Sequence, residues 1–319
     1  MKILITGCAG FIGFGLCEEL LKNRKIKIIG IDNLNSYYSV NYKNKRLSIL
    51  KKNNNFFFKK IDISNYKKLK EIFSYHKINL VINLAAQAGV RYSMINPKAY
   101  VDCNVIGFFN IIELCRIKKI KKIIYASSSS IYGDNKKFPL SEKNELKPKN
   151  MYALSKKINE EMAQSYSFLY NIKFVGLRFF TVYGEWGRPD MFIMKYIISS
   201  LKQKKFILNN YGNHYRDFTY IKDVILILKQ IIKKKQSKKH EIYNICSSKP
   251  VKITNIIKFI DKYFKKPKIK KTSLQIADVL KTHGSNRKIL NFIKLKKITK
   301  INDGLRNVCI WAQENKTKF

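Results

Sequence analysis

The feature that most constrains this chain is a glycine-rich turn close to its N-terminus. Gly7, Gly10 and Gly13 directly follow a short apolar segment, residues 2–6, and open an apolar-periodic segment, residues 11–21. The first segment predicts a β-strand and the second a helix. Glycines at this junction let backbone N–H groups come close to a pyrophosphate at the positive end of the helix dipole. The turn therefore predicts a dinucleotide site.

An acidic residue supports the same interpretation. Residues 26–31 predict a second strand, and Asp32 stands at its end, 19 residues after Gly13. A carboxylate at this position can accept hydrogen bonds from both hydroxyls of an adenosine ribose, whereas it repels the 2′-phosphate of NADP. The predicted cofactor is therefore NAD. An ordinary tight turn followed by a capping aspartate is the alternative, and the order of strand, turn, helix, strand and acid argues against it.

Alternating apolar segments continue along most of the chain. Short, almost continuously apolar runs predict buried strands, and longer periodic runs between them predict helices. This alternation predicts an α/β fold, a doubly wound parallel sheet of the Rossmann type with a smaller C-terminal lobe that binds substrate. The pattern becomes irregular after Arg178. We therefore expect residues 1–180 to form the NAD-binding domain, which residues 223–249 rejoin, and residues 181–222 and 250–319 to form the smaller lobe.

Three polar side chains form a candidate catalytic set. Tyr152 and Lys156 lie four residues apart in a predicted helix, residues 151–170, so their side chains share one face. A phenol with a reference pKa of about 10 is a weak base at neutral pH, and a neighbouring ammonium favours its ionised form. The phenolate can then accept a proton from a sugar hydroxyl as hydride leaves the same carbon. Ser128, within the serine run 127–130 at the end of a predicted strand, can hold the substrate oxygen.

The net charge of +43 invites the hypothesis of a nucleic-acid or anionic-membrane partner. Only nine of the 64 basic residues are arginine, however, and Lys, Ile, Asn, Phe and Tyr are enriched together, as expected of a compositionally biased chain. A surface selected for nucleic acid would also use arginine. No run of about 18 apolar residues that could span a membrane occurs. We therefore expect no nucleic-acid and no membrane partner, and we interpret the lysine runs as solvated surface.

The cysteines and the first residues of the chain indicate the cellular compartment of the protein. Six cysteines are scattered without any CxxC pair, which gives neither the spacing of a zinc site nor the density of a disulfide scaffold. The three apolar residues before Thr6 are too few for the core of a signal peptide, which needs roughly 7 to 15. We expect a cytoplasmic protein with reduced thiols and no metal site.

Several longer stretches carry a family resemblance over nearly the whole chain. They are residues 32–38, 85–93, 104–107, 127–133, 178–191 and 216–220, and the runs 87–93 and 186–191 are the most specific. On these motifs the chain resembles the extended short-chain dehydrogenase/reductases. Within that group it is similar to the NAD-dependent nucleotide-sugar epimerases and dehydratases, and most of all to the UDP-glucuronate 4-epimerases.

The resemblance implies a role for each matching position. Tyr152 would be the catalytic base, Lys156 its partner and the anchor of the nicotinamide ribose, and Ser128 the hydroxyl that polarises the C4 oxygen of the sugar. The NAD ligands that it implies, besides Tyr152 and Lys156, are Gly7, Gly10, Phe11, Ile12, Gly13, Asp32, Asn33, Asn35, Asp62, Ile63, Ala85, Ala86 and Asn104. The substrate ligands that it implies are Gln87, Arg91, Ser129, Ser130, Thr181, Arg188, Arg216 and Asp278.

The implied activity is 4-epimerisation of a UDP-sugar through a transient 4-keto sugar, with NAD retained and no net redox change. UDP-glucuronate is the expected substrate, UDP-galacturonate the product and a polysaccharide precursor the product class. A UDP-glucose or UDP-N-acetylhexosamine 4-epimerase, a uronate decarboxylase and a 4,6-dehydratase are the enzymatic alternatives. The dehydratases commonly carry Asp-Glu where this chain has Ser129 and Ser130. An inactive NAD sensor is disfavoured because Ser128, Tyr152 and Lys156 are all present.

The resemblance also implies a homodimer. In this family the helices that correspond to residues 99–116 and 151–170 pair with those of a second copy. Leu114, Met162 and Leu169 are the expected contacts. The alternative is that these side chains belong to the core of a single chain.

Overall fold

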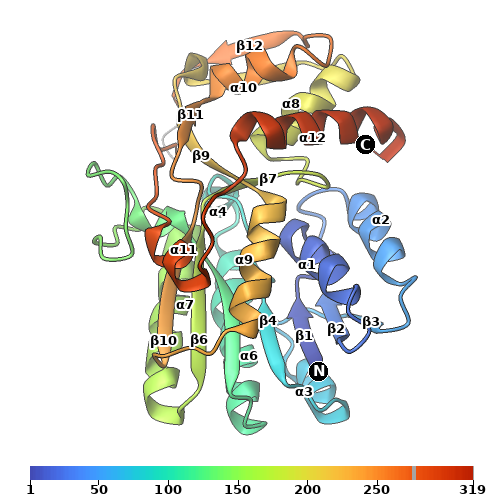
Figure 1. The fold of residues 1–319 in the computed structure, drawn as a ribbon, viewed down its shortest axis with the longest axis vertical. Coiled ribbons are helices and arrows are strands. Elements are labelled where there is room, and N and C mark those ends of the chain that lie inside the picture. Colours follow the sequence, from blue (N-terminus) through green and yellow to red (C-terminus); the bar gives the residue numbers. More distant parts are fainter. Residues whose placement is uncertain (275–277, 319) are drawn as a thin grey trace.

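The computed structural model describes residues 1–274 and 278–318 of the chain. At its centre lies a seven-stranded parallel sheet in the order β10-β6-β5-β4-β1-β2-β3 (Figure 1). Every neighbouring pair in this sheet is parallel, which confirms the predicted doubly wound fold. Its strands are β1 (Lys2–Thr6), β2 (Lys27–Asp32), β3 (Phe56–Lys60), β4 (Leu80–Asn83), β5 (Lys122–Ser128), β6 (Lys173–Phe179) and β10 (His240–Ile245).

Helices pack on both faces of this sheet. Neighbouring residues of β1 point to opposite faces, so Ile3 and Ile5 join one hydrophobic core and Leu4 joins the other. The described helices include none that is both long and apolar enough to cross a membrane. The helices on the Ile3 side are α1 (Phe11–Leu21), α2 (Val40–Leu50), α9 (Ile221–Lys233) and α11 (Arg287–Ile293), and those on the Leu4 side are α3 (Tyr66–Tyr75), α6 (Gly107–Ile117) and α7 (Met151–Tyr170).

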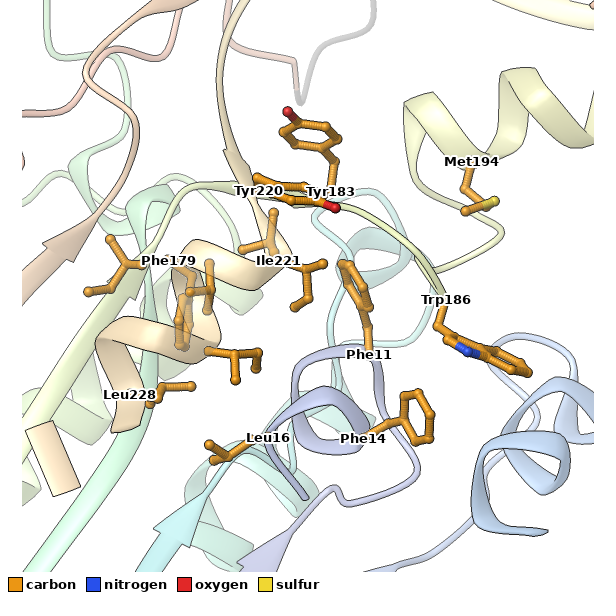
Figure 2. Close-up of a cluster of buried hydrophobic side chains, with 14 of the residues drawn as sticks. Phe11, Phe14, Leu16, Phe179, Tyr183, Trp186, Met194, Tyr220, Ile221 and Leu228 are labelled. Atoms are coloured by element: carbon orange, nitrogen blue, oxygen red, sulfur yellow. The ribbon is translucent and has the colours of Figure 1, made fainter. Parts of the chain in front are cut away.

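Two smaller sheets and three helices lie above the carboxyl ends of the central strands (Figure 1). An aromatic cluster joins them to the central sheet, and Figure 2 shows Trp186 beside Phe14 of α1, with their ring centroids 5.4 Å apart. One sheet has the order β11-β9-β7 and the other pairs β12 with β8. These elements are β7 (Thr181–Tyr183), β8 (Phe206–Asn209), β9 (Tyr215–Tyr220), β11 (Pro250–Lys252), β12 (Ile269–Thr272), α8 (Phe192–Leu201), α10 (Ile253–Ile260) and α12 (Ile301–Glu314).

The expected helix over residues 99–116 is interrupted. A short helix, α4 (Tyr92–Ile95), and a single turn, α5 (Lys98–Tyr100), lead into a π-helical segment, Val101–Ile106, before α6 begins. Gly107 lies at this junction, where a Cβ atom would come within 2.5 Å of the Ile63 side chain. The close approach of this helix to the loop after β3 therefore requires a residue without a side chain.

One expectation about the dimer contacts is wrong. Leu114 is 1% exposed and belongs to the hydrophobic core between α6 and the sheet, because it points inward from its helix. Met162 packs against the same core, whereas Leu169 is 61% exposed. Of the three expected contacts, Leu169 lies on the free surface of a single chain and Met162 is partly exposed.

Candidate active site

A cavity of about 620 Å³ opens at the carboxyl ends of the central strands, beneath β8 and β9. This is the position where parallel α/β sheets bind their ligands. The cavity brings together residues that are more than 250 positions apart in the chain. From the predicted set it is lined by Gly7, Gly10, Phe11, Ile12, Gly13, Asp32, Asn33, Asn35, Ile63, Ala85, Ala86, Gln87, Arg91, Ser128, Ser129, Ser130, Tyr152, Lys156, Thr181, Arg188, Arg216 and Asp278.

Two predicted ligands lie behind the cavity wall. Asp62 accepts hydrogen bonds from the side-chain amide of Asn33 (2.7 Å) and from the backbone N–H of Ser64 (2.9 Å). Asn104 is buried, accepts from the N–H of Gln87 (2.8 Å) and donates to its carbonyl oxygen (3.0 Å). Both side chains therefore hold residues that line the cavity, and a direct contact of either with NAD stays a prediction.

Two glycines of the glycine-rich turn, Gly7 and Gly13, are packed too tightly to be replaced by a residue with a side chain. A Cβ atom on Gly7, whose φ is +69°, would lie 2.7 Å from the backbone nitrogen of Ala85, and one on Gly13 would lie 2.1 Å from the carbonyl oxygen of Gly7. Gly10 precedes α1 and offers no side-chain cap to the first N–H groups of the helix. These groups start at Phe11, which lines the cavity. The turn therefore fits an anionic pyrophosphate.

Asp32 is buried at the end of β2, next to the glycine turn. Its carboxylate accepts hydrogen bonds from the backbone N–H groups of Leu34 (2.8 Å) and Ala9 (3.2 Å). Burial raises the pKa of Asp32, and the nearby charge of Lys43 opposes that rise. The Lys43 ammonium is itself held by the backbone and side-chain oxygens of Asn35, at 2.7 and 2.9 Å. A carboxylate fixed at this position fits the ribose hydroxyls of NAD.

The candidate catalytic side chains Ser128, Tyr152 and Lys156 meet in the cavity. Lys156 donates to the backbone oxygen of Ala126 (2.9 Å), and burial lowers its pKa to about 8. Burial raises the pKa of Tyr152, and the described groups that oppose this rise are a hydrogen bond with Ser128 and the charge of Arg188. Lys156 is not among the groups that shift the Tyr152 pKa here, because its buried ammonium donates to a carbonyl, and its role as the partner of Tyr152 stays a prediction.

Arg188 lies in the cavity with a carboxylate already beside it. Its Nε donates to Oδ1 of Asp190 (3.1 Å) and its Nη2 to Oδ2 (2.5 Å). The guanidinium carbon lies 5.5 Å from the ring centre of Tyr37, whose hydroxyl donates to Asp190 (3.3 Å). Burial alone would raise the pKa of Asp190, but the Arg188 charge and hydrogen bonds hold it below its usual value.

A second cationic group lies on the side of the cavity formed by β9. Arg91 forms a two-pronged ion pair with Asp278, with nitrogen–oxygen distances of 3.2 and 2.7 Å, and His214 Nε2 lies 3.8 Å from the same carboxylate. Burial lowers the pKa of Arg216 to about 10. Arg91 and Asp278 were both expected to contact the substrate, and here they contact each other. Two guanidinium groups near one carboxylate leave this end of the cavity suited to an anion.

Sequence reasoning missed several residues of the cavity. Tyr37, Tyr38 and Asp190 stand inside the stretches that carry the family resemblance, so a signal for them existed. Others come from segments without a local motif, and only the fold brings them to the site. The unpredicted polar and aromatic residues that line the cavity include Tyr37, Tyr38, Lys43, Cys103, Asp190, Lys195, Asn209 and His214.

The cavity combines the glycine turn and Asp32 with the side chains of Tyr152, Lys156 and Ser128. This combination defines a dinucleotide-dependent enzyme of the short-chain dehydrogenase/reductase type. The chain belongs to the NAD dependent epimerase/dehydratase family, which residues 3–246 match. Its cofactor is NAD, as the sequence predicted.

Comparisons over the full chain agree with this membership. Protein CapI of Staphylococcus aureus is 41% identical over 332 residues, covering 98% of this chain and 99% of that protein. The UDP-glucuronate 4-epimerase of Thermodesulfobacterium geofontis (strain OPF15) is 39% identical over 315 residues, covering 98% and 96%. The crystal structure of UDP-glucuronic acid 4-epimerase from Bacillus cereus, in complex with UDP-glucuronic acid and NAD, superposes with a TM-score of 0.92 at 31% identity, covering 98% and 99%.

Proposed function

We propose that this protein catalyses the NAD-dependent 4-epimerisation of a UDP-sugar, and that the sugar is glucuronate, interconverted with galacturonate. One observation carries the proposal. A single cavity holds a dinucleotide cradle, the candidate base Tyr152 with Ser128 on the same wall, and the cation Arg188. The similarity to UDP-glucuronate 4-epimerases supports the same substrate.

The residues of the cavity can perform the proton transfers of this reaction. When bound, NAD supplies a hydride acceptor for C4 of the sugar and returns the hydride later. Tyr152 accepts the proton of the C4 hydroxyl, while Ser128 holds the oxygen that becomes a ketone. The 4-keto sugar then rotates within the cavity. Tyr152 returns the proton after hydride arrives on the other face of the sugar. Tyr152 ends the cycle in its first state, and return of the hydride to C4 would leave bound NAD oxidised as before, so no exchange of cofactor would be needed.

A uronic acid makes an additional demand on the site. Its 4-keto form is a β-keto acid, which loses carbon dioxide readily unless the carboxylate is held away from the reactive orientation. Arg188 supplies a guanidinium within the cavity, and Ser129, Ser130 and Thr181 supply hydroxyls on its wall. We propose that these four side chains hold the carboxylate, which would suppress decarboxylation.

The carboxylates of the cavity argue against a dehydratase. Elimination across C5 and C6 needs an acid next to the catalytic hydroxyl, where this chain has Ser129 and Ser130. The acidic residues among those that line the described cavity are Asp32, Asp190 and Asp278. Each is engaged by backbone N–H groups or by an arginine.

We propose the functional division that the sequence predicts. Residues 1–180 and 223–249 hold NAD, and residues 181–222 and 250–319 hold the UDP-sugar, although residues 275–277 and 319 of the second part lie outside the described residues. The sheet that contains β10 and the smaller sheets above it support this division. We also propose a cytoplasmic location, where nucleotide sugars and reduced thiols coexist.

We propose a homodimer formed through α6, the π-helical segment before it and α7. These elements pack together, since Tyr166 donates to Glu113 (3.0 Å) across them. The two helices and the π-helical segment also carry large apolar side chains that are exposed to solvent. The exposed ones are Val101, Ile106, Phe109, Ile117, Leu154, Phe168, Leu169 and Tyr170.

A panel of UDP-sugars, resolved by proton NMR, tests the function. UDP-glucuronate, UDP-glucose and UDP-N-acetylglucosamine are incubated separately with the purified protein. We expect UDP-galacturonate as the main product and the highest kcat/KM on UDP-glucuronate. A UDP-pentose as the main product would indicate a decarboxylase instead, and turnover of the neutral sugars alone would contradict the assignment of Arg188.

A further inference from the structure

We propose that Asp190 is a positioning residue that orients Arg188 toward the carboxylate of the substrate and so contributes to the selection of a uronic acid. This inference rests on the proposed function. Three features of the described residues carry it: the edge of the guanidinium that Asp190 occupies, the fixed position of the loop that holds both residues, and the contact of Tyr37 with the pair.

The geometry of the ion pair leaves one edge of Arg188 available. Asp190 contacts Nε and Nη2, which form the side-on edge of the guanidinium. A guanidinium carries five N–H donors in a planar fork, and two of them are used by Asp190. The end-on edge, formed by Nη1 and the second N–H of Nη2, carries the parallel donors that a substrate carboxylate would use. Asp190 therefore holds the plane of Arg188 while it leaves a two-pronged site.

The loop that carries the pair is held by buried contacts. The backbone oxygen of Trp186 accepts a hydrogen bond from the buried side chain of Arg46 (2.5 Å). The Trp186 ring packs on Phe14, as Figure 2 shows, and the N–H of Gly187 donates to Gly184 (3.0 Å). Because the backbone before Arg188 is fixed in this way, the main freedom left to its guanidinium is rotation of the side chain. Asp190 restricts that rotation.

Tyr37 connects this ion pair to the segment that follows β4. Its hydroxyl donates to Asp190 and its ring lies against the Arg188 guanidinium. The Tyr37 ring centre also lies 5.1 Å from that of Tyr92, and a Cβ on Gly89 would come within 2.2 Å of the Tyr37 hydroxyl. Asp190 is thus confined by a side chain from the loop after β2, which itself packs against the loop after β4.

The inference predicts the sign of the effect of neutralising Asp190. If Asp190 were only a counter-charge, its removal would strengthen the attraction of Arg188 for a substrate carboxylate. If Asp190 orients Arg188, its removal releases the guanidinium and weakens the two-pronged contact. The two accounts predict opposite changes in uronate turnover, so one set of variants separates them.

The partition between two products gives a readout that a merely structural role would not change. In the 4-keto uronate the C5–C6 bond can break as carbon dioxide leaves, its electron pair forming an enolate across C4 and C5 that takes up a proton at C5. Return of the hydride to C4 then gives a UDP-pentose without net redox change. A substrate whose carboxylate is held less firmly should lose carbon dioxide more often.

The experiment compares Asp190→Asn and Tyr37→Phe with the wild type on UDP-glucuronate, with products resolved by NMR. We expect Asp190→Asn to lower kcat/KM on the order of tenfold and to raise the pentose fraction. Tyr37→Phe should give a smaller loss in the same direction. Affinity for UDP, which lacks the carboxylate, should stay within about twofold. Asp134→Asn, which removes the surface ion pair with Lys149, is the matched control and should match the wild type.

Unchanged or improved uronate turnover in Asp190→Asn, with an unchanged pentose fraction, would overturn the inference. An equal loss of uronate turnover and UDP affinity would also overturn it, since that result indicates a general structural role. Failure of the wild type to epimerise UDP-glucuronate would instead count against the proposed function. The two failures are therefore distinguished by the wild-type measurement made first.

Discussion

The ammonium of Lys156 lies 2.9 Å from the backbone oxygen of Ala126, where it connects α7 to β5 beneath the cavity. Lys156 is 2% exposed, and burial lowers its pKa from 10.5 to about 8. A cation in this position lowers the stability of the protein without bound cofactor, because one hydrogen bond replaces full hydration. A phosphate-bearing cofactor near it would reduce that cost.

The stability of the cofactor-free protein should therefore depend on pH through Lys156. The unfolded chain binds this proton more tightly than the folded protein, so the cost of charging is fully present below about pH 8 and disappears as pH rises through about 10.5. Relative to Lys156→Met, the free energy of unfolding of the wild type should rise by roughly 3 kcal/mol across this window. Urea denaturation of both proteins at several pH values measures the difference. A difference that is constant with pH would contradict the burial of a charged Lys156.

The purified protein should carry NAD. The buried carboxylate of Asp32 favours ribose hydroxyls and repels a 2′-phosphate, and the proposed catalytic cycle regenerates the cofactor in place. Extraction followed by mass spectrometry identifies what is bound. Asp32→Asn, which keeps the shape and removes the charge, should narrow the preference for NAD over NADP. Recovery of mainly NADP from the wild type would show that the role given to Asp32 is wrong.

Truncation of Arg188 should affect uronate recognition in particular. Loss of a charge-assisted contact in Arg188→Ala should cost about 1.5 to 3 kcal/mol in transition-state binding of UDP-glucuronate. Arg188→Lys should recover part of this loss, because an ammonium cannot reproduce the two-pronged contact. Kinetics on UDP-glucuronate and UDP-glucose measure both variants. Equal losses on the two sugars, without a pentose product, would indicate that Arg188 has only a structural role.

The proposed dimer depends on exposed apolar side chains of α7. Phe168 is 75% exposed in the single chain, so its burial in a second copy would stabilise the dimer. Phe168→Glu should therefore shift the protein toward monomer in light scattering at micromolar concentration. Ile310→Glu, on the distant helix α12, changes another exposed apolar residue, 43% exposed, and should leave the dimer intact. A wild-type monomer at that concentration would contradict the proposal.

The fold was predictable where a local pattern determines an element. Residues 11–21 and 151–170 are helices with the expected bounds, and Asn150 caps the second by accepting from the N–H of Ala153 (2.9 Å). The helix α2 was not predicted, because its sequence is mostly polar. It forms where Ser39 caps it and three spaced side chains reach the core. Those buried side chains are Tyr42, Leu47 and Leu50.

The site was predictable to the extent that single residues or short motifs define it. The glycine turn, Asp32, Tyr152 and Arg188 all line the cavity as expected. The side chain that each of these residues contacts was not predictable, because such contacts depend on burial and on loops that meet only in the folded chain. The partner of Arg188 stands two residues away at Asp190, yet nothing local shows that the two side chains turn toward each other.

The most direct test of the account follows deuterium at C4 of UDP-glucuronate. Hydride transfer to a retained cofactor and back should give UDP-galacturonate that keeps its deuterium at C4 in ordinary water. Tyr152→Phe, which removes one oxygen and keeps the ring, should abolish this conversion while the variant still binds UDP. NMR of the product of both proteins measures these results. Loss of the label to solvent, or turnover of the variant close to that of the wild type, would contradict epimerisation through a 4-keto sugar with Tyr152 as the base.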